Sequence, residues 1–122
     1  MSHALTLYYN PSCSKCQKAV ELLDQLNYAY HTIDYLENGL TQQEVHNLIR
    51  VLNLRAEDII RKDDLKKYDL SPDILLNHES IVATISKKPA LLQRPILLFK
   101  SEIGIIARPP EKIIAFLKSL KA

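Results

Sequence analysis

Two cysteines three residues apart, Cys13 and Cys16, are the side chains of this sequence best suited to chemistry. They follow an Asn-Pro pair and stand where a segment of helical periodicity begins. A cysteine at a helix start faces unpaired N–H groups and the positive end of the helix dipole, which favour the thiolate. We therefore predict Cys13 as an exposed nucleophile and Cys16, one turn further on, as a candidate resolving thiol within disulfide reach. Asn10 and Pro11 are expected to stiffen the turn that presents Cys13.

The same pair also fits two other interpretations. Free cysteines are often small core residues, so both could be inert. A zinc site needs four ligands, but the sequence has two cysteines and four histidines spread along the chain, His3, His31, His46 and His78. We predict a reactive pair and no metal site. The Cys-x-x-Cys spacing indicates redox chemistry without selecting a substrate.

Three arginines are candidates for binding an anion beside the thiolate. Arg94 precedes Pro95 at the start of an apolar run, Arg108 ends another apolar run before two prolines, and Arg61 opens the charged segment 62–67. A guanidinium offers a planar fork of donors that matches two oxygens of a tetrahedral oxyanion. Gathered positive charge would also lower the pKa of Cys13. The alternative for each arginine is an ordinary surface ion pair.

Hydrophobic patterning places the cysteine pair between a strand and a helix. The apolar run 4–9 predicts a buried strand, the stripe over 14–26 an amphipathic helix, and the aromatic and branched run 28–36 a second strand. A β-α-β start implies two parallel strands joined by a right-handed crossover.

The middle of the chain, about 40–90, has a helical pattern. Thr41 and Glu44 form a capping-box motif before one helical stripe, and a short helix is expected over 56–61. Ser71, followed by proline, predicts the start of another helix, whose buried face would carry Ile74, His78, Ile81, Val82 and Ile85.

The last third of the chain predicts a hairpin of strands 96–99 and 103–107, followed by a helix. The order β-α-β, helical insert, β-β-α is the thioredoxin topology, an α/β fold with a mixed four-stranded sheet. We predict one thioredoxin-like domain over 1–122 with the helical insert at about 40–90. In such proteins a cis proline precedes the third strand beside the active cysteine, so the Arg94–Pro95 bond is expected to be cis.

The composition excludes few functions, but it indicates the compartment and the kinds of partner to expect. The chain has 122 residues and a formal net charge of +2, so nothing in the global balance demands nucleic acid or an anionic membrane. No apolar stretch approaches the ~20 residues that cross a bilayer, and no signal-peptide pattern is visible. Two cysteines without a secretion signal indicate a reducing compartment. We expect a cytoplasmic monomer that binds neither membrane nor nucleic acid.

Three motifs together resemble one family. Residues 10–16 read Asn-Pro-Ser-Cys-Ser-Lys-Cys, residues 91–96 read Leu-Leu-Gln-Arg-Pro-Ile, and residues 108–111 read Arg-Pro-Pro-Glu. With Tyr-Leu-Glu at 35–37 and the helix 41–52, they cover essentially the whole chain and resemble the glutaredoxin-linked arsenate reductases.

The resemblance implies an activity and a set of roles. Cys13 would attack arsenate while Arg61, Arg94 and Arg108 hold the oxyanion, with Asn10 and Pro95 in support. Glutathione would then attack the arseno-cysteine, arsenite would leave, and glutaredoxin would remove glutathione from Cys13. The resemblance implies glutathione as a co-substrate and no bound cofactor.

The chain departs from the family pattern at three positions. Tyr9 stands where these reductases often have a histidine, and Ala107 where they often have glycine. Cys16 stands where they usually have serine or another residue without a thiol. A second thiol permits a Cys13–Cys16 disulfide that competes with the glutathione step.

A non-enzymatic alternative has the same fold. Spx-type transcription regulators resemble this chain and carry a Cys-x-x-Cys redox switch at the same place; they bind the α subunit of RNA polymerase. Cys16 favours the regulators. Arg61 and the Arg-Pro-Pro-Glu motif at 108–111 match the reductases, and we predict the enzyme.

Overall fold

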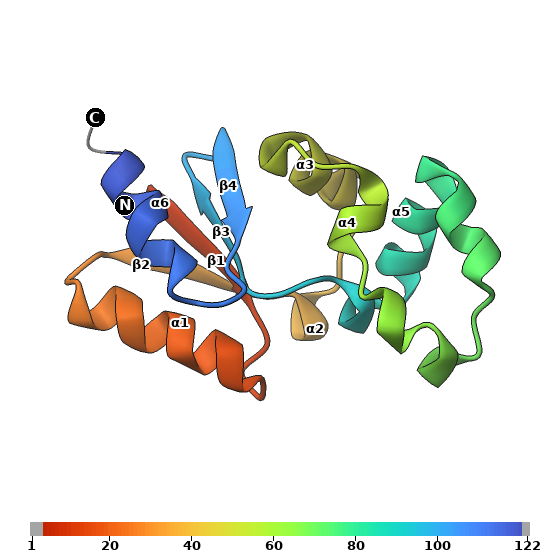
Figure 1. Ribbon diagram of the computed structural model, residues 1–122, viewed down its shortest axis with the longest axis horizontal. Helices are drawn as coiled ribbons and strands as arrows, with labels where there is room; N and C mark the ends of the chain where they lie inside the picture. The colour runs from red at the N-terminus through yellow and green to blue at the C-terminus, as the bar shows by residue number, and fades with distance from the viewer. Residues whose placement is uncertain (1–3, 121–122) are drawn as a thin grey trace. The chain divides into compact units, whose positions relative to one another are not determined.

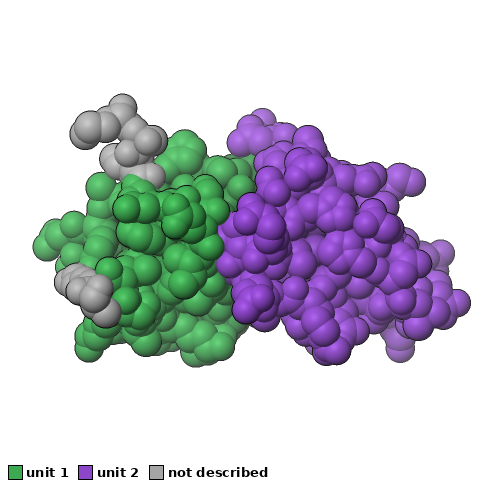
Figure 2. Space-filling model, turned by 90° about the horizontal axis from the view of Figure 1, so that it is seen from above, with its two compact units in different colours: residues 1–35, 94–122 green, residues 36–93 purple. Residues whose placement is uncertain are grey.

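The computed structural model describes residues 4–120. The chain divides into two compact units (Figure 2): unit 1 comprises Met1–Tyr35 and Arg94–Ala122, and unit 2 comprises Leu36–Gln93. The expected helical insert at about 40–90 falls within unit 2. The ends of the predicted domain 1–122 lie outside the described residues.

The elements of unit 1 are two helices and four strands, with a further short helix at the point where unit 2 begins. They are β1 (Leu5–Tyr9), α1 (Ser14–Gln25), β2 (Tyr30–Asp34), α2 (Tyr35–Asn38), β3 (Ile96–Phe99), β4 (Ile103–Ile106) and α6 (Lys112–Ser119). The strands form one mixed sheet in the order β2-β1-β3-β4, with β1 parallel to β2 and antiparallel to β3, and β3 antiparallel to β4. The predicted fold class, α/β with a mixed four-stranded sheet, is confirmed.

Helices α1 and α6 pack together on one face of this sheet (Figure 1). The core that they share with β1 and β3 consists of apolar side chains at most 7% exposed: Leu5, Leu7, Ala19, Leu23, Leu97, Ala107, Ile113, Phe116 and Leu117. Each large side chain buried in this way contributes about 1.5–3 kcal/mol of transfer free energy. This packing fixes α1, and with it the first turn that carries the cysteines, against the sheet.

The second strand is shorter than the predicted 28–36. Helix α1 ends at Gln25 with Leu26 as its C-cap, and Asn27 adopts the left-handed conformation with φ 62°. The Tyr28 N–H donates to the Leu23 carbonyl oxygen at 3.1 Å, which closes the helix end and delays the strand to Tyr30. At its other end the strand stops because Tyr35 begins α2.

Unit 2 is helical. Its elements are α3 (Gln42–Leu52), α4 (Ala56–Ile59), α5 (His78–Lys87) and the 3₁₀ turns η1 (Lys62–Asp64), η2 (Lys66–Tyr68), η3 (Pro72–Leu76) and η4 (Pro89–Leu91). The predicted capping box is confirmed: the Glu44 N–H donates to Thr41 Oγ1 at 3.0 Å, and the Thr41 N–H donates to Glu44 Oε1 at 3.1 Å. Buried apolar residues of α3, α4 and α5 form the core of this unit.

Two predicted helices of unit 2 have different bounds. The helix expected over 56–61 ends at Ile59, because Ile60 pairs with Leu92 in an antiparallel bridge. The helix expected from Ser71 is interrupted at Asn77, whose backbone is extended with φ −145° and ψ 154°. The Asn77 side chain accepts from the Ser80 N–H at 2.7 Å and starts α5 anew.

The interruption at Asn77 changes the place of one predicted core residue. His78 becomes the first residue of α5 and is exposed, instead of lying on the buried face. Ile81, Val82 and Ile85 are buried as predicted, whereas Ile74, in the 3₁₀ turn η3, is only half-buried. Within residues 4–120, no helix has the length and apolar character that crossing a bilayer requires.

Candidate thiol site

Cys13 occupies the position just before α1. Its backbone is extended, with φ −92° and ψ 126°, and its carbonyl oxygen accepts the first helical hydrogen bond, from the Gln17 N–H at 2.9 Å. The Cys13 N–H donates to the Asn10 carbonyl oxygen at 3.0 Å, and the Ser12 N–H donates to Asn10 Oδ1 at 2.9 Å. Asn10 therefore closes the turn that presents the Cys13 side chain at the helix N-terminus.

The surroundings of the Cys13 sulfur favour its ionised form. Burial works against ionisation, since Cys13 is half-buried. Hydrogen bonds to the sulfur from the Cys16 N–H, the Cys16 thiol, the Arg94 guanidinium and the Lys15 N–H outweigh it and lower the pKa of Cys13 to about 7. A large fraction of Cys13 is therefore thiolate at neutral pH, as a nucleophile requires.

Cys16 has the opposite environment. It is fully buried, and burial together with the negative charge of Cys13 raises the pKa of Cys16 to about 12, although the Asn10 N–H donates to its sulfur at 3.4 Å. Neither cysteine is in a disulfide. The start of the helix thus carries two different thiols. Cys13 ionises readily, whereas Cys16 keeps its proton and donates it in a hydrogen bond to the Cys13 sulfur.

Arg94 brings a positive charge to Cys13. Burial lowers the pKa of Arg94, but the Tyr35 phenol and the Cys13 sulfur, to which the guanidinium is hydrogen-bonded, raise it overall. The guanidinium therefore remains charged beside the thiolate. The Arg94–Pro95 peptide bond is cis, as predicted.

Tyr35 is a residue of this site to which the sequence had assigned no role, although it begins the Tyr-Leu-Glu motif at 35–37. It is fully buried at the start of α2, directly after β2, and interacts electrostatically with the Arg94 guanidinium. The sequence offered one signal, a tyrosine at the end of a strand whose hydroxyl needs a polar neighbour when it is buried. Nothing in the sequence linked it to Arg94, 59 positions away.

Arg108 lies close to Arg94 in unit 1. Its Nη1 donates to the Arg94 carbonyl oxygen at 2.9 Å, and the Arg108–Pro109 bond is also cis. The preceding Ala107 is fully buried, and its N–H donates to the Pro95 carbonyl oxygen at 2.8 Å. The strand end that carries Arg108 is therefore tied to the loop that carries Arg94.

Arg61 belongs to unit 2 and has a carboxylate partner there. Its Nε donates to Asp64 Oδ2 at 2.8 Å, with both side chains largely buried, and its N–H donates to the Leu91 carbonyl oxygen at 2.7 Å. Asp64, in the charged segment 62–67, is thus part of an ion pair. The predicted role of Arg61 toward an oxyanion stays a prediction.

The sequence had indicated that the four histidines are scattered, but two of them lie together in the structure. His46 of α3 and His78 of α5 are hydrogen-bonded to each other in unit 2, at 2.9 Å between ring nitrogens. His3 lies outside the described residues.

Comparison with known proteins assigns the chain to a family. The sequence profile of the ArsC family matches residues 8–116. The chain belongs to the ArsC family. This ArsC-family protein is 32% identical over 115 residues to an arsenate reductase of Neisseria meningitidis, a match that covers 93% of this chain and 97% of that relative.

Two further relatives show the range of the family. The ArsC-family chain is 30% identical over 102 residues to the global transcriptional regulator Spx of Streptococcus agalactiae, covering 83% of this chain and 74% of that relative. The solved structure of an arsenate reductase from Vibrio cholerae matches with a TM-score of 0.76 and 28% identity, covering 94% of this chain and 98% of that one. The resemblance found in the sequence is confirmed, and it includes both reductases and regulators.

Proposed function

We propose that this ArsC-family protein is an arsenate reductase-like thiol oxidoreductase with Cys13 as its nucleophile. The observation that carries the proposal is the Cys13 sulfur, half-exposed before α1 and hydrogen-bonded to the Arg94 guanidinium. The site has a sulfur that ionises near neutral pH and a fixed cation beside it, the two features that attack on an oxyanion requires.

In the first step the Cys13 thiolate attacks the arsenic of arsenate. A sulfur–arsenic bond forms, one oxygen of arsenate leaves as water after protonation, and arsenic remains As(V) in the product. Arg94 stabilises the negative oxygens during this step, and Arg108 does so from the neighbouring strand end. Arg61 is proposed as a third oxyanion-binding residue.

In the second step glutathione supplies the electrons. Its thiolate attacks the Cys13 sulfur, the electron pair of the sulfur–arsenic bond moves to arsenic, and As(III) leaves as arsenite. Cys13 is then a mixed disulfide with glutathione. A glutaredoxin thiol attacks the glutathione sulfur and releases the Cys13 thiolate, so that each cycle reduces one arsenate. These steps need no bound cofactor, only a compartment that supplies glutathione, such as the cytoplasm.

The direct test is turnover by the purified protein. With glutathione, glutaredoxin and NADPH-linked recycling, the protein is expected to convert arsenate to arsenite. Cys13→Ser should abolish the reaction, whereas Ser12→Ala, a change in the neighbouring exposed residue, should preserve it. Absence of turnover in the wild type would reject the proposed activity.

The buried Cys16 thiol favours a second candidate, a redox-sensing regulator of the Spx type. Its sulfur is hydrogen-bonded to that of Cys13, so a peroxide can oxidise the two thiols to a disulfide, with two electrons passing to the oxidant. In this alternative the disulfide controls binding to the α subunit of RNA polymerase. Capture of that subunit by a protein without arsenate turnover would support the regulator over the enzyme.

The role of Cys16 in turnover has its own test. After mild oxidation, mass spectrometry should find the Cys13–Cys16 disulfide in the wild type. Cys16→Ser incubated with oxidised glutathione should instead keep glutathione on Cys13. A wild-type protein that gives only the glutathione adduct would show that Cys16 does not resolve it.

A further inference from the structure

His46, His78 and Glu79 meet on unit 2, and none of them belongs to unit 1, which carries Cys13 and Arg94. Nε2 of His78 lies 2.9 Å from Nδ1 of His46, and the two rings stack with centroids 4.9 Å apart and planes 16° from parallel. The second ring nitrogen of His46, Nε2, lies 3.6 Å from Glu79 Oε2. Two imidazoles from different helices and one carboxylate thus lie together, with His78 at one ring nitrogen of His46 and Glu79 at the other.

We propose that these three residues form a binding site for a divalent transition-metal ion of the zinc class. One ligand atom from each side chain lies within 4.8 Å of the others. Imidazole nitrogen with a carboxylate oxygen is a donor set typical of Zn²⁺ and Co²⁺, whereas Ca²⁺ and Mg²⁺ prefer oxygen alone.

The spacing of the two imidazoles fits such an ion. With zinc–nitrogen bonds of about 2.05 Å, two ligands of a tetrahedral site stand about 3.3 Å apart. The observed 2.9 Å separation therefore has to open by only about 0.4 Å. In the absence of an ion the two nitrogens are joined by a hydrogen bond. When the ion takes the place of this hydrogen bond, the proton of the donor nitrogen moves to the other nitrogen of the same imidazole ring.

Each imidazole belongs to a residue of a helix, which fixes the position of its Cα atom. His46 lies in α3 next to the buried Val45, and His78 begins α5 directly after Asn77, whose side chain caps the helix. The side chain of Glu79 is 75% exposed, so it is able to turn onto an ion without disturbing the core.

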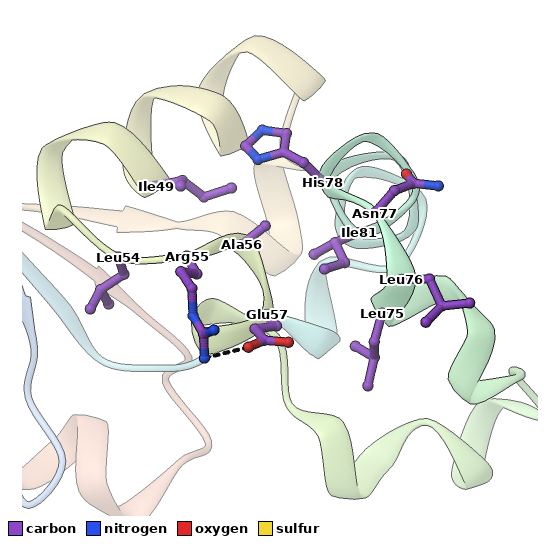
Figure 3. A pocket seen from close by; sticks show the side chains of 10 residues that line it. All are labelled: Ile49, Leu54, Arg55, Ala56, Glu57, Leu75, Leu76, Asn77, His78 and Ile81. Atoms are coloured by element: carbon purple, nitrogen blue, oxygen red, sulfur yellow. Dashed lines mark ion pairs between the residues drawn. The ribbon is translucent and has the colours of Figure 1, made fainter.

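An ion can reach the site from solvent. The His46 side chain is 33% exposed, and the His78 ring lies at the edge of a cavity of about 460 Å³ in unit 2 (Figure 3). Three protein ligands leave at least one coordination position for water on a tetrahedral ion.

The test is a titration with zinc chloride in a Cys13→Ser background, which removes the exposed thiolate as a competing ligand. Calorimetry should show one Zn²⁺ bound per chain, and chelation should reverse it. His46→Gln and His78→Gln should each lower the affinity by more than tenfold, and Glu79→Gln by about tenfold. His31→Gln on β2 and His3→Gln are the matched controls, and neither should change the affinity.

Cobalt and thermal unfolding give independent readouts. Co²⁺ should produce visible d–d bands without a thiolate charge-transfer band, and Zn²⁺ should raise the unfolding temperature of the Cys13→Ser protein but not of His78→Gln in that background. Because His78 and Glu79 are exposed, their variants are expected to fold even if His46→Gln does not. Unchanged affinity in His78→Gln and Glu79→Gln, or absence of zinc binding in the Cys13→Ser protein, would overturn the proposal.

Discussion

The thiol site of unit 1 and the histidine cluster of unit 2 hold their polar side chains in different ways. In unit 1 the main chain makes most of the contacts: N–H groups of Cys16 and Lys15 reach the Cys13 sulfur, and the Arg94 carbonyl oxygen receives Arg108. In unit 2 the imidazole rings of His46 and His78 contact each other, and the exposed carboxylate of Glu79 lies beside His46. The first site is therefore built largely from backbone geometry and the second from side-chain packing between helices.

This difference explains why the two sites suit different tasks. Backbone dipoles at a helix start cannot turn away, so they stabilise the Cys13 thiolate without reorganisation. An exposed cluster of side chains is free to rearrange around an incoming ion. Preorganised charge suits catalysis, and adjustable ligands suit binding.

Among tests of this contrast between the two units, Arg94→Ala is expected to have the largest effect, on arsenate turnover and on the pKa of Cys13. It removes a side-chain cation that is hydrogen-bonded to Cys13, so we expect turnover of arsenate to fall by about 10²–10³-fold and the pKa of Cys13 to rise. Steady-state kinetics and thiol titration measure the two effects. The exposed Arg50→Ala on α3 is the control. A Cys13 pKa that stays at about 7 in Arg94→Ala would show that the backbone N–H groups and the Cys16 thiol ionise Cys13 without Arg94.

The next largest effect is the difference in reactivity between the two thiols. The pKa of Cys13 is lowered, so its thiolate is abundant above pH 7 and is lost as the pH falls through about 7. Alkylation by iodoacetamide should slow about tenfold for each pH unit below that midpoint. Cys16, with a pKa of about 12, should react at least about 100-fold more slowly at neutral pH. Peptide mass spectrometry measures both rates, and a midpoint near the ordinary ~8.5 for Cys13 would contradict the proposed site.

A smaller effect tests whether unit 2 contributes to the chemistry of Cys13. If Arg61 binds the oxyanion, Arg61→Ala should lower kcat/KM for arsenate about tenfold, the worth of one charge-assisted hydrogen bond. Asp64→Asn, which removes the carboxylate partner of Arg61, is the matched control and should stay within about twofold of the wild type. Unchanged kinetics in Arg61→Ala would leave Arg61 as a structural ion pair of unit 2.

The smallest expected effect concerns the stability of unit 2. Thr41→Ala removes the oxygen that accepts from the Glu44 N–H, and should lower the free energy of unfolding by ~1 kcal/mol. Urea denaturation measures the loss, with the exposed Gln43→Ala of the same helix expected to stay within about 0.5 kcal/mol. Arsenate turnover should be unchanged in both variants, and a loss in Thr41→Ala would show that unit 2 is coupled to the thiol site.

The sequence by itself determined the features that depend on near neighbours in the chain. The order of strands and helices, the capping box at Thr41, and the cysteine at the start of α1 follow from periodicity, capping preferences and the helix dipole. These forces act over a few residues, so the local sequence is sufficient. The cis Arg94–Pro95 bond was predicted from the topology that this order implied.

Only the tertiary structure decided which distant side chains meet. Tyr35 beside Arg94, the Arg108 guanidinium on the Arg94 carbonyl oxygen, and the contact of His46 with His78 join residues far apart in the chain. The last contact also required the break at Asn77, which turned His78 from the predicted core face to the surface. Such contacts depend on how whole elements pack, and that packing is set by many weak apolar contacts that no short stretch of sequence encodes.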